Sequence, residues 1–260
     1  MDLGLTAAGL GVGLLVGLTG MGAGSLMTPI LITVFGIPAS TAVGTDLVYA
    51  AITKAFGAAR HSQLKNVNRE LALWMATGSV PAAFAGTFTL YHVFGESINS
   101  WLPNVIGITL VAVGIAVAIR TFVTIRGLWD ASKLPTDGPL TTRHKTYAVI
   151  IGVVFGFILG LTSVGSGVFF GMTLVTLFPL SARRVVGTDL LHAFLVTMAA
   201  GLGTILFGVP NYGYVATILV GSIPGILIGS HFTHRLPERA LRGSIAGVLA
   251  LSGMKLLGAF

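Results

Sequence analysis

The chain has 260 residues, of which 54% are hydrophobic and only 9% are charged, and its mean hydropathy is +0.92. Soluble domains carry about 25% charged residues, so this composition excludes a water-soluble domain and indicates an integral membrane protein. At about 20 residues per helical crossing, the length allows about ten crossings and leaves almost no chain for an appended enzyme or sensor domain. Without cysteine, disulfides, thiolate nucleophiles and cysteine-based metal sites are excluded.

Apolar segments follow one another along the whole chain, and their order repeats. Two short segments are followed by three longer ones, and this order recurs after a polar connector. The predicted segments are 3–19, 21–35, 41–59, 71–93 and 102–123, then 147–161, 164–178, 185–207, 214–232 and 241–257. The sequence therefore predicts an all-α polytopic membrane protein with about eight to ten membrane helices.

The recurring order reflects an internal duplication. A shift of 143 residues places Gly17–Ala50 over its counterpart with 15 identities in 34 positions, and it also superposes Gly78-Ser79-Val80-Pro81 on a Gly-Ser-Ile-Pro sequence. Self-similarity at a fixed offset is the signature of a repeat. We therefore divide the chain into repeat 1 (1–125), a cytoplasmic connector (126–145) and repeat 2 (146–260).

The basic residues predict how the repeats are oriented. Thirteen of the fifteen lie in four clusters, at 60–69, 120–145, 183–184 and 235–242. Because cytoplasmic loops carry excess Lys and Arg, we place all four clusters on the inner side. Each half must then cross the membrane an odd net number of times, which makes the repeats inverted and leaves both termini outside. The first two segments of each half then form a broken or re-entrant helical hairpin.

Glycine motifs interrupt these hairpins at Gly20–Gly24 and Ser163–Gly167. Unpaired amide groups cannot face lipid, so such breaks are buried or line a wet cavity. Matching breaks in inverted repeats point to the binding site of a secondary transporter, where restarting helices direct their positive ends at an anion. Close helix packing is the alternative role of these glycines. The candidate substrate-binding residues here are Thr19, Gly20, Gly22, Gly24 and Ser25, with Thr162, Ser163, Gly165, Ser166 and Gly167 in the second copy.

Two acids and one base lie inside apolar segments, where a charge costs about 2.5 to 3.5 kcal/mol. Asp46 and Asp189 hold matching positions and either accept amide hydrogen bonds from the broken segment or bind a coupling proton. Lys54 either compensates the charge of the substrate or snorkels toward the inner face. Tyr49 and its counterpart His192 lie one turn beyond each Asp, and we assign them with the two acids to coupling or gating; packing is the alternative.

The Gly-Leu-Thr-Gly-Met-Gly-Ala-Gly-Ser sequence at 17–25, the duplicated Val-Gly-Thr-Asp-Leu, Arg60-His61 and Asn66-Val67-Asn68 resemble the sulfite exporter TauE/SafE family over essentially the whole chain. The resemblance implies a permease of a bacterial-type plasma membrane that exports sulfite, sulfonates such as sulfoacetate, or related organosulfur anions. It assigns no binding residue.

The leading hypothesis is a secondary anion transporter that works by alternating access between the repeats and is not an enzyme. Its expected partners are a small anionic substrate and the lipid bilayer, without nucleic acid, cofactor or metal, and a homo-oligomer is left open. One alternative is a passive anion channel. Another is an intramembrane aspartyl protease using Asp46 and Asp189, but inverted topology places these acids near opposite faces, too far apart to share a proton.

Overall fold

The computed structural model describes residues 2–19, 24–94, 97–125, 138–165, 167–178, 180–232, 247 and 249–258, and the regular structure within them is entirely helical. The elements are α1 (Leu3–Thr19), α2 (Gly24–Thr33), α3 (Ala39–Gln63), α4 (Arg69–Phe88), the π-helical η1 (Thr89–Val93), α5 (Ile98–Ile125), α6 (Thr142–Thr162), α7 (Val168–Leu177), α8 (Ala182–Phe207) and α9 (Tyr212–Phe232). Five helices among the described residues are long and apolar enough to cross a membrane. The prediction of an all-α polytopic membrane protein is confirmed.

Helix starts recur at the offset found in the sequence. Helices α3 and α4 begin at Ala39 and Arg69, and α8 and α9 begin 143 residues later, at Ala182 and Tyr212. Helix α6 begins at Thr142, inside the predicted connector, because the Thr141 hydroxyl accepts from the His144 amide and the His144 side chain accepts from the Thr141 amide. Such a capping box satisfies amide groups that the first turn leaves unpaired.

Helix pairs α1–α2 and α6–α7 each fold back on themselves. At the end of α7 the Phe178 ring lies 5.8 Å from the His144 ring at the start of α6. In the first pair, a Cβ added at Gly4 would lie 3.3 Å from the Phe35 ring. Each hairpin therefore returns to the end from which it began, which is the down-and-back course that the charge pattern requires.

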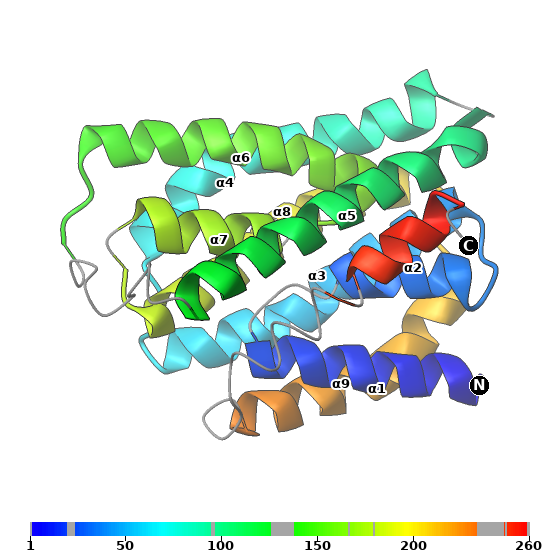
Figure 1. Cartoon of the computed structure of the whole chain (residues 1–260), viewed down its shortest axis with the longest axis horizontal. Coiled ribbons are helices and arrows are strands. Elements are labelled where there is room, and N and C mark those ends of the chain that lie inside the picture. Colours follow the sequence, from blue (N-terminus) through cyan, green and yellow to red (C-terminus); the bar gives the residue numbers. More distant parts are fainter. Residues whose placement is uncertain are drawn as a thin grey trace.

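Two tightly packed helix pairs form opposite edges of the bundle, α1 with α9 and α4 with α6 (Figure 1). A Cβ at Gly221 of α9 would lie 2.0 Å from the Thr6 carbonyl oxygen of α1, and one at Gly78 of α4 would lie 2.2 Å from the Val149 carbonyl oxygen of α6. These two contacts are related by the 143-residue shift. Small residues let membrane helices approach this closely, so both edges are built on the same glycine positions.

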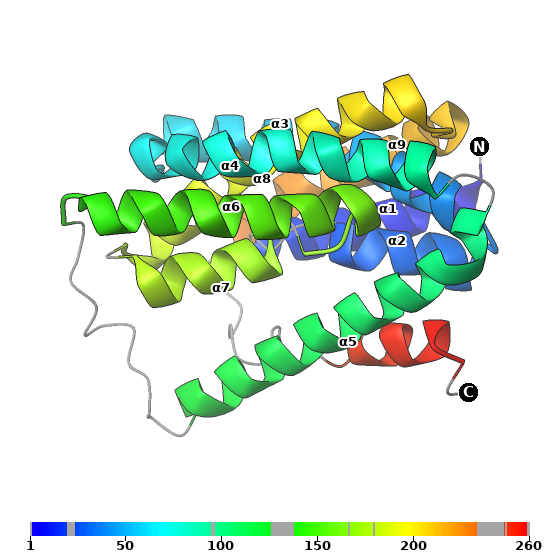
Figure 2. The ribbon, with the colours of Figure 1, turned by 90° about the horizontal axis from the view of Figure 1, so that it is seen from above.

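Helices α3 and α8 pack against each other between these edges. Gly57 of α3 lies beside Leu190 of α8, and Gly44 lies beside Thr204. Because residue numbers rise on one helix as they fall on the other, α3 and α8 are antiparallel, an orientation that inverted repeats require. Helix α5 crosses obliquely on one side of the bundle, with the C-terminal segment 249–258 alongside it (Figure 2).

Candidate functional site

Asp46 connects the two hairpins. Its side chain on α3 is fully buried, and its Oδ2 accepts hydrogen bonds from the Thr28 hydroxyl of α2 at 2.5 Å and from the Ser163 hydroxyl at 2.8 Å. Ser163 belongs to the break in the second hairpin. Both donors are side-chain hydroxyls, whereas the sequence pointed to backbone amides. One carboxylate thus joins α2 of the first half to the broken helix of the second.

The second break is fully buried where it is described. Helix α6 ends at Thr162, Ser163 adopts a left-handed conformation with φ of 58°, and Gly165 has φ of +97° before α7 begins at Val168. The Thr162 hydroxyl donates to the Ile158 carbonyl at 2.8 Å and accepts from the Val164 amide at 3.2 Å. Thr162 therefore stabilises the turn itself.

Not every predicted binding residue can be placed. Thr19 ends α1, Gly24 begins α2 with Ser25 as its second residue, and Gly167 caps the start of α7. Gly20, Gly22 and Ser166 lie outside the described residues. Among the predicted serines and threonines whose side chains the structure describes, Ser163 is the one whose hydroxyl reaches a buried acid.

Replacing Ser163 with alanine is expected to remove one of the two hydroxyl donors to Asp46. Hydrogen bonds between membrane helices contribute about 0.6 kcal/mol on average and about 1.7 kcal/mol at most, so we expect a loss of about 1 kcal/mol in unfolding free energy. Stepwise unfolding in mixed micelles measures it. The matched control is Thr176→Ala on α7, because that exposed hydroxyl bonds only within its own helix. Equal stability of both variants would contradict the connecting role of Ser163.

Asp189 holds the matching position on α8 but has different neighbours. Its side chain is 3% exposed, and its Oδ1 makes no hydrogen bond in the described structure. The counterpart of Thr28 is Gly171, whose added Cβ would lie 3.7 Å from Asp189 Oδ2. The counterpart of Ser163 is Gly20, outside the described residues. Two identical side chains in matching positions thus occupy chemically different surroundings.

Lys54 lies on α3 with its side chain fully buried, and it interacts electrostatically with both Asp46 and Asp189. The snorkelling alternative is therefore wrong, because protein encloses the ammonium group on all sides.

The two acids are far apart. Leu190 packs beside Gly57, so Asp189 lies about eleven residues along α3 from Asp46, or about 16 Å at 1.5 Å per residue. The acids cannot share a proton, which removes the geometric basis of an aspartyl protease.

Tyr49 and His192 each face a serine of an edge helix. His192 Nε2 lies 2.7 Å from the Ser79 hydroxyl of α4. The Tyr49 hydroxyl lies near the Ser222 hydroxyl of α9 without hydrogen-bond geometry in the described structure. Sequence reasoning did not single out these serines, although both stand in the duplicated Gly-Ser-x-Pro sequence that revealed the repeat.

The duplicated Val-Gly-Thr-Asp sequence also receives a loop from the opposite half. The Thr188 hydroxyl accepts from the Asn68 amide at 2.9 Å, and the Thr45 hydroxyl accepts from the Asn211 amide at 3.1 Å. A Cβ at Gly187 would lie 2.1 Å from the Asn66 carbonyl oxygen. Glycine and threonine thus hold the loop, while the aspartate that follows points to the hairpins. Sequence reasoning missed this docking role.

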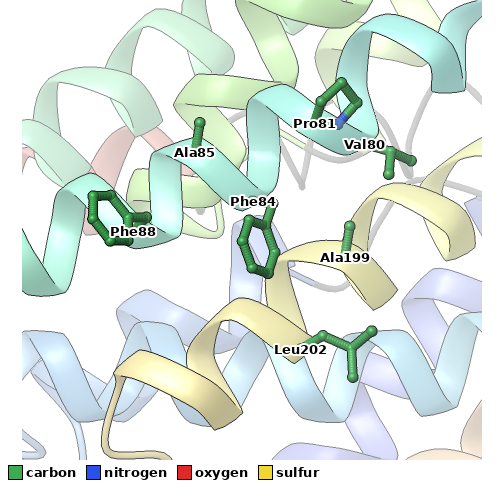
Figure 3. A pocket seen from close by; sticks show the side chains of 7 residues that line it. All are labelled: Val80, Pro81, Phe84, Ala85, Phe88, Ala199 and Leu202. Atoms are coloured by element: carbon green, nitrogen blue, oxygen red, sulfur yellow. The ribbon is translucent and has the colours of Figure 1, made fainter.

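An apolar groove lies between α4 and α8 (Figure 3). Its lining residues are Val80, Pro81, Phe84, Ala85, Phe88, Ala199 and Leu202. None of these side chains carries a charge or a hydrogen-bond donor, so the groove is unsuited to an anion. The charged and hydroxyl side chains around Asp46, Lys54 and Asp189 form the better candidate site.

Broken helices that gather buried charged and hydroxyl groups inside a multi-pass bundle are the hallmark of membrane transporters. The profile of the family described as sulfite exporter TauE/SafE matches residues 5–256. The chain belongs to this family and is a multi-pass membrane transporter, as the resemblance in its motifs implied.

Relatives of the same kind cover almost the full length. The chain is 42% identical over 262 residues to the probable membrane transporter protein YjnA of Bacillus subtilis, covering 99% of this chain and 100% of the relative. It is 29% identical to the probable membrane transporter protein YdhB of the same organism, over 95% of this chain and 96% of the relative. A probable membrane transporter protein of Methanocaldococcus jannaschii is 25% identical over 97% of this chain and 94% of the relative. No solved structure matches the chain significantly.

Proposed function

We propose that this transporter exports a small sulfur-containing anion, such as sulfite or the sulfonate sulfoacetate, across a bacterial-type plasma membrane. The observation that carries the proposal is the fully buried ammonium of Lys54, which lies within electrostatic range of one acid from each half. A buried positive charge at the centre of a transporter suits an anionic cargo. The proposal that this anion contains sulfur comes from the description of the family as sulfite exporters.

The proposed binding site lies between the two hairpins, with Lys54 as its positive charge. The start of α7 at Val168 and the start of α2 at Gly24 add the positive ends of two helix dipoles, which favour bound anions. Thr19, Ser25 and Ser166 are the proposed further donors, and Gly20 and Gly22 are assigned to the same site by their place in the glycine motif of the sequence. Hydroxyl groups and amides can discriminate a sulfur oxyanion from chloride, because the oxyanion offers several acceptor oxygens in fixed directions and chloride offers none.

Transport in this proposal follows from movement of one inverted repeat against the other. Asp46 bridges α2 of repeat 1 and the break after α6 of repeat 2, so its hydrogen bonds must change when the repeats move. With both termini outside and the connector in the cytoplasm, the basic clusters lie on the inner side. The inside-negative potential then favours exit of an anion by about 2.3 kcal/mol per charge per 100 mV.

Reconstitution into liposomes tests the substrate class directly. Sulfite, sulfoacetate, thiosulfate and sulfate are presented separately, and uptake of each radiolabelled anion is followed with the same unlabelled anion trapped inside. We expect saturable counterflow for sulfite or sulfoacetate. Uptake that rises linearly with concentration and shows no counterflow would identify a passive channel instead. Movement of none of the four anions would overturn the proposed substrate class.

A further inference from the structure

Among the residues that the structure describes, an odd number of buried charged side chains lies at the centre of the bundle. Asp46 and Asp189 are both acids and Lys54 is a base, and their exposed fractions are 0%, 3% and 0%. One ammonium can balance only one carboxylate. An unbalanced charge in a low-dielectric interior is strongly unfavourable, and a buried carboxyl group usually takes up a proton instead. One of the two acids is therefore expected to be neutral in this conformation.

The hydrogen bonds decide which acid is neutral. Hydroxyl donors stabilise the ionised form of a carboxylate. Asp46 Oδ2 receives two of them, from Thr28 and Ser163, and in the described structure the Oδ1 atoms of both acids receive none. Glycine at 171, where repeat 1 has Thr28, leaves Asp189 without the matching hydroxyl. Asp46 is thus equipped to stay ionised beside Lys54, and Asp189 is equipped to carry the proton.

Among the described residues, the other groups around Asp189 do not supply a second balancing charge. Helix α3 contributes Lys54, which Asp189 shares with Asp46. Helix α7 contributes Gly171, which has no side chain. On α8 itself, His192 is turned toward Ser79 of α4 and contacts the Phe170 ring, whose centroid is 4.3 Å away.

We propose that Asp189 binds a proton together with the transported anion, while Asp46 remains a fixed ionised partner of Lys54; this inference rests on the proposed function. When Asp189 is ionised, an anion approaching Lys54 meets two carboxylates. Protonation of Asp189 removes one of these negative charges, so each ligand favours the binding of the other, and this coupling is reciprocal. The asymmetry between the repeats thus assigns the coupling ion to repeat 2.

The number of charges moved follows from this stoichiometry. A monoanion that travels with one proton carries no net charge, so the membrane potential does not drive its exit and its distribution follows the pH gradient. A dianion with one proton keeps one negative charge, so the membrane potential also contributes. With one proton per anion, the steady-state accumulation of anion changes about tenfold for each unit of pH difference across the membrane.

The proton site can be tested without any substrate. Infrared difference spectra of the reconstituted full-length protein, recorded between high and low pH, report the carbonyl stretch of a protonated carboxylic acid. We expect this band in the wild type and in Asp46→Asn, and we expect its loss in Asp189→Asn. Loss of the band in Asp46→Asn with retention in Asp189→Asn would overturn the assignment. Absence of the band from the wild type would overturn it as well.

A transport experiment then separates the inference from the proposed function. In liposomes with a pH gradient, the wild type is expected to accumulate sulfite or sulfoacetate, and Asp189→Asn is expected to lose gradient-driven accumulation and make any residual counterflow independent of pH. Gly171→Ser offers Asp189 a hydroxyl and should move the pH midpoint of transport downward. If the rate of anion transport by the wild type does not depend on pH, the proposed coupling is wrong. Failure of every anion to move, with the infrared band assigned to Asp189, would overturn only the proposed function.

Discussion

Alanine at Gly160 or Gly221 is expected to destabilise the folded protein by about 3 kcal/mol or more, the upper range for overpacking a tightly packed interior. A Cβ at Gly160 would lie 2.2 Å from the Ala83 carbonyl oxygen, and one at Gly221 would lie 2.0 Å from the Thr6 carbonyl oxygen. Backbone oxygens cannot rotate away as a side chain can, so the helices must separate. Unfolding in mixed micelles, followed by circular dichroism, measures the loss.

Gly11→Ala is the matched control for these variants. Gly11 lies on α1, which also forms the contact with Gly221, but its added Cβ meets nothing within 4 Å. Alanine there should leave stability unchanged or raise it slightly, because alanine favours the helix over glycine by about 1 kcal/mol. If Gly11→Ala and Gly221→Ala lowered the free energy of unfolding equally, the role of Gly221 in the close approach of the helices would be contradicted.

Replacing Lys54 with methionine is expected to cost about 3 to 5 kcal/mol of stability, because removal of one partner from a buried ionic group leaves the other uncompensated. The variant retains a long side chain but leaves Asp46 and Asp189 without their shared base. We also expect transport of the sulfur anion to be lost, since the proposed site has no other buried ammonium among the described residues. Chemical unfolding and liposome counterflow measure the two effects separately.

A second substitution distinguishes the two roles of Lys54. In Lys54→Met with Asp46→Asn, the carboxylate that Lys54 balanced has been removed, so part of the stability should return while transport stays absent. Lys255→Met is the control, because Lys255 is exposed near the C-terminal end and lies outside the site. Normal transport by Lys54→Met would rule out its role as the charge that holds the anion.

The sequence predicted those parts of the fold that depend on one-dimensional pattern. The lengths of the apolar segments predicted the helices. The 143-residue shift predicted that α3 and α8 begin at matching positions, Ala39 and Ala182. Burial costs singled out Asp46, Lys54 and Asp189, all of which are at most 3% exposed. These inferences succeed because few backbone conformations can satisfy all their hydrogen bonds inside a bilayer, and because every buried charge there is costly.

The contacts between the two halves could not be predicted from the sequence pattern. The hydroxyl of Thr28 looks like any threonine in an apolar helix, and only the crossing of α2 and α3 brings it to Asp46. Asn68 and Asn211 stand in polar loops whose partners lie more than a hundred residues away. The pattern within one segment carries no information on which distant segment it meets. The difference between Thr28 and Gly171 was nevertheless visible in the aligned repeats.

The docking of each loop on the opposite half has a consequence for biosynthesis. Thr45 is inserted early, but its hydrogen-bond partner Asn211 is synthesised 166 residues later. Helix α1 likewise waits for α9 before its glycine contacts can form. The first half must therefore remain in the membrane with its packing surfaces uncovered while the second half is translated. Expression of either half alone should leave the product open to degradation, whereas co-expression of the two fragments should let them assemble.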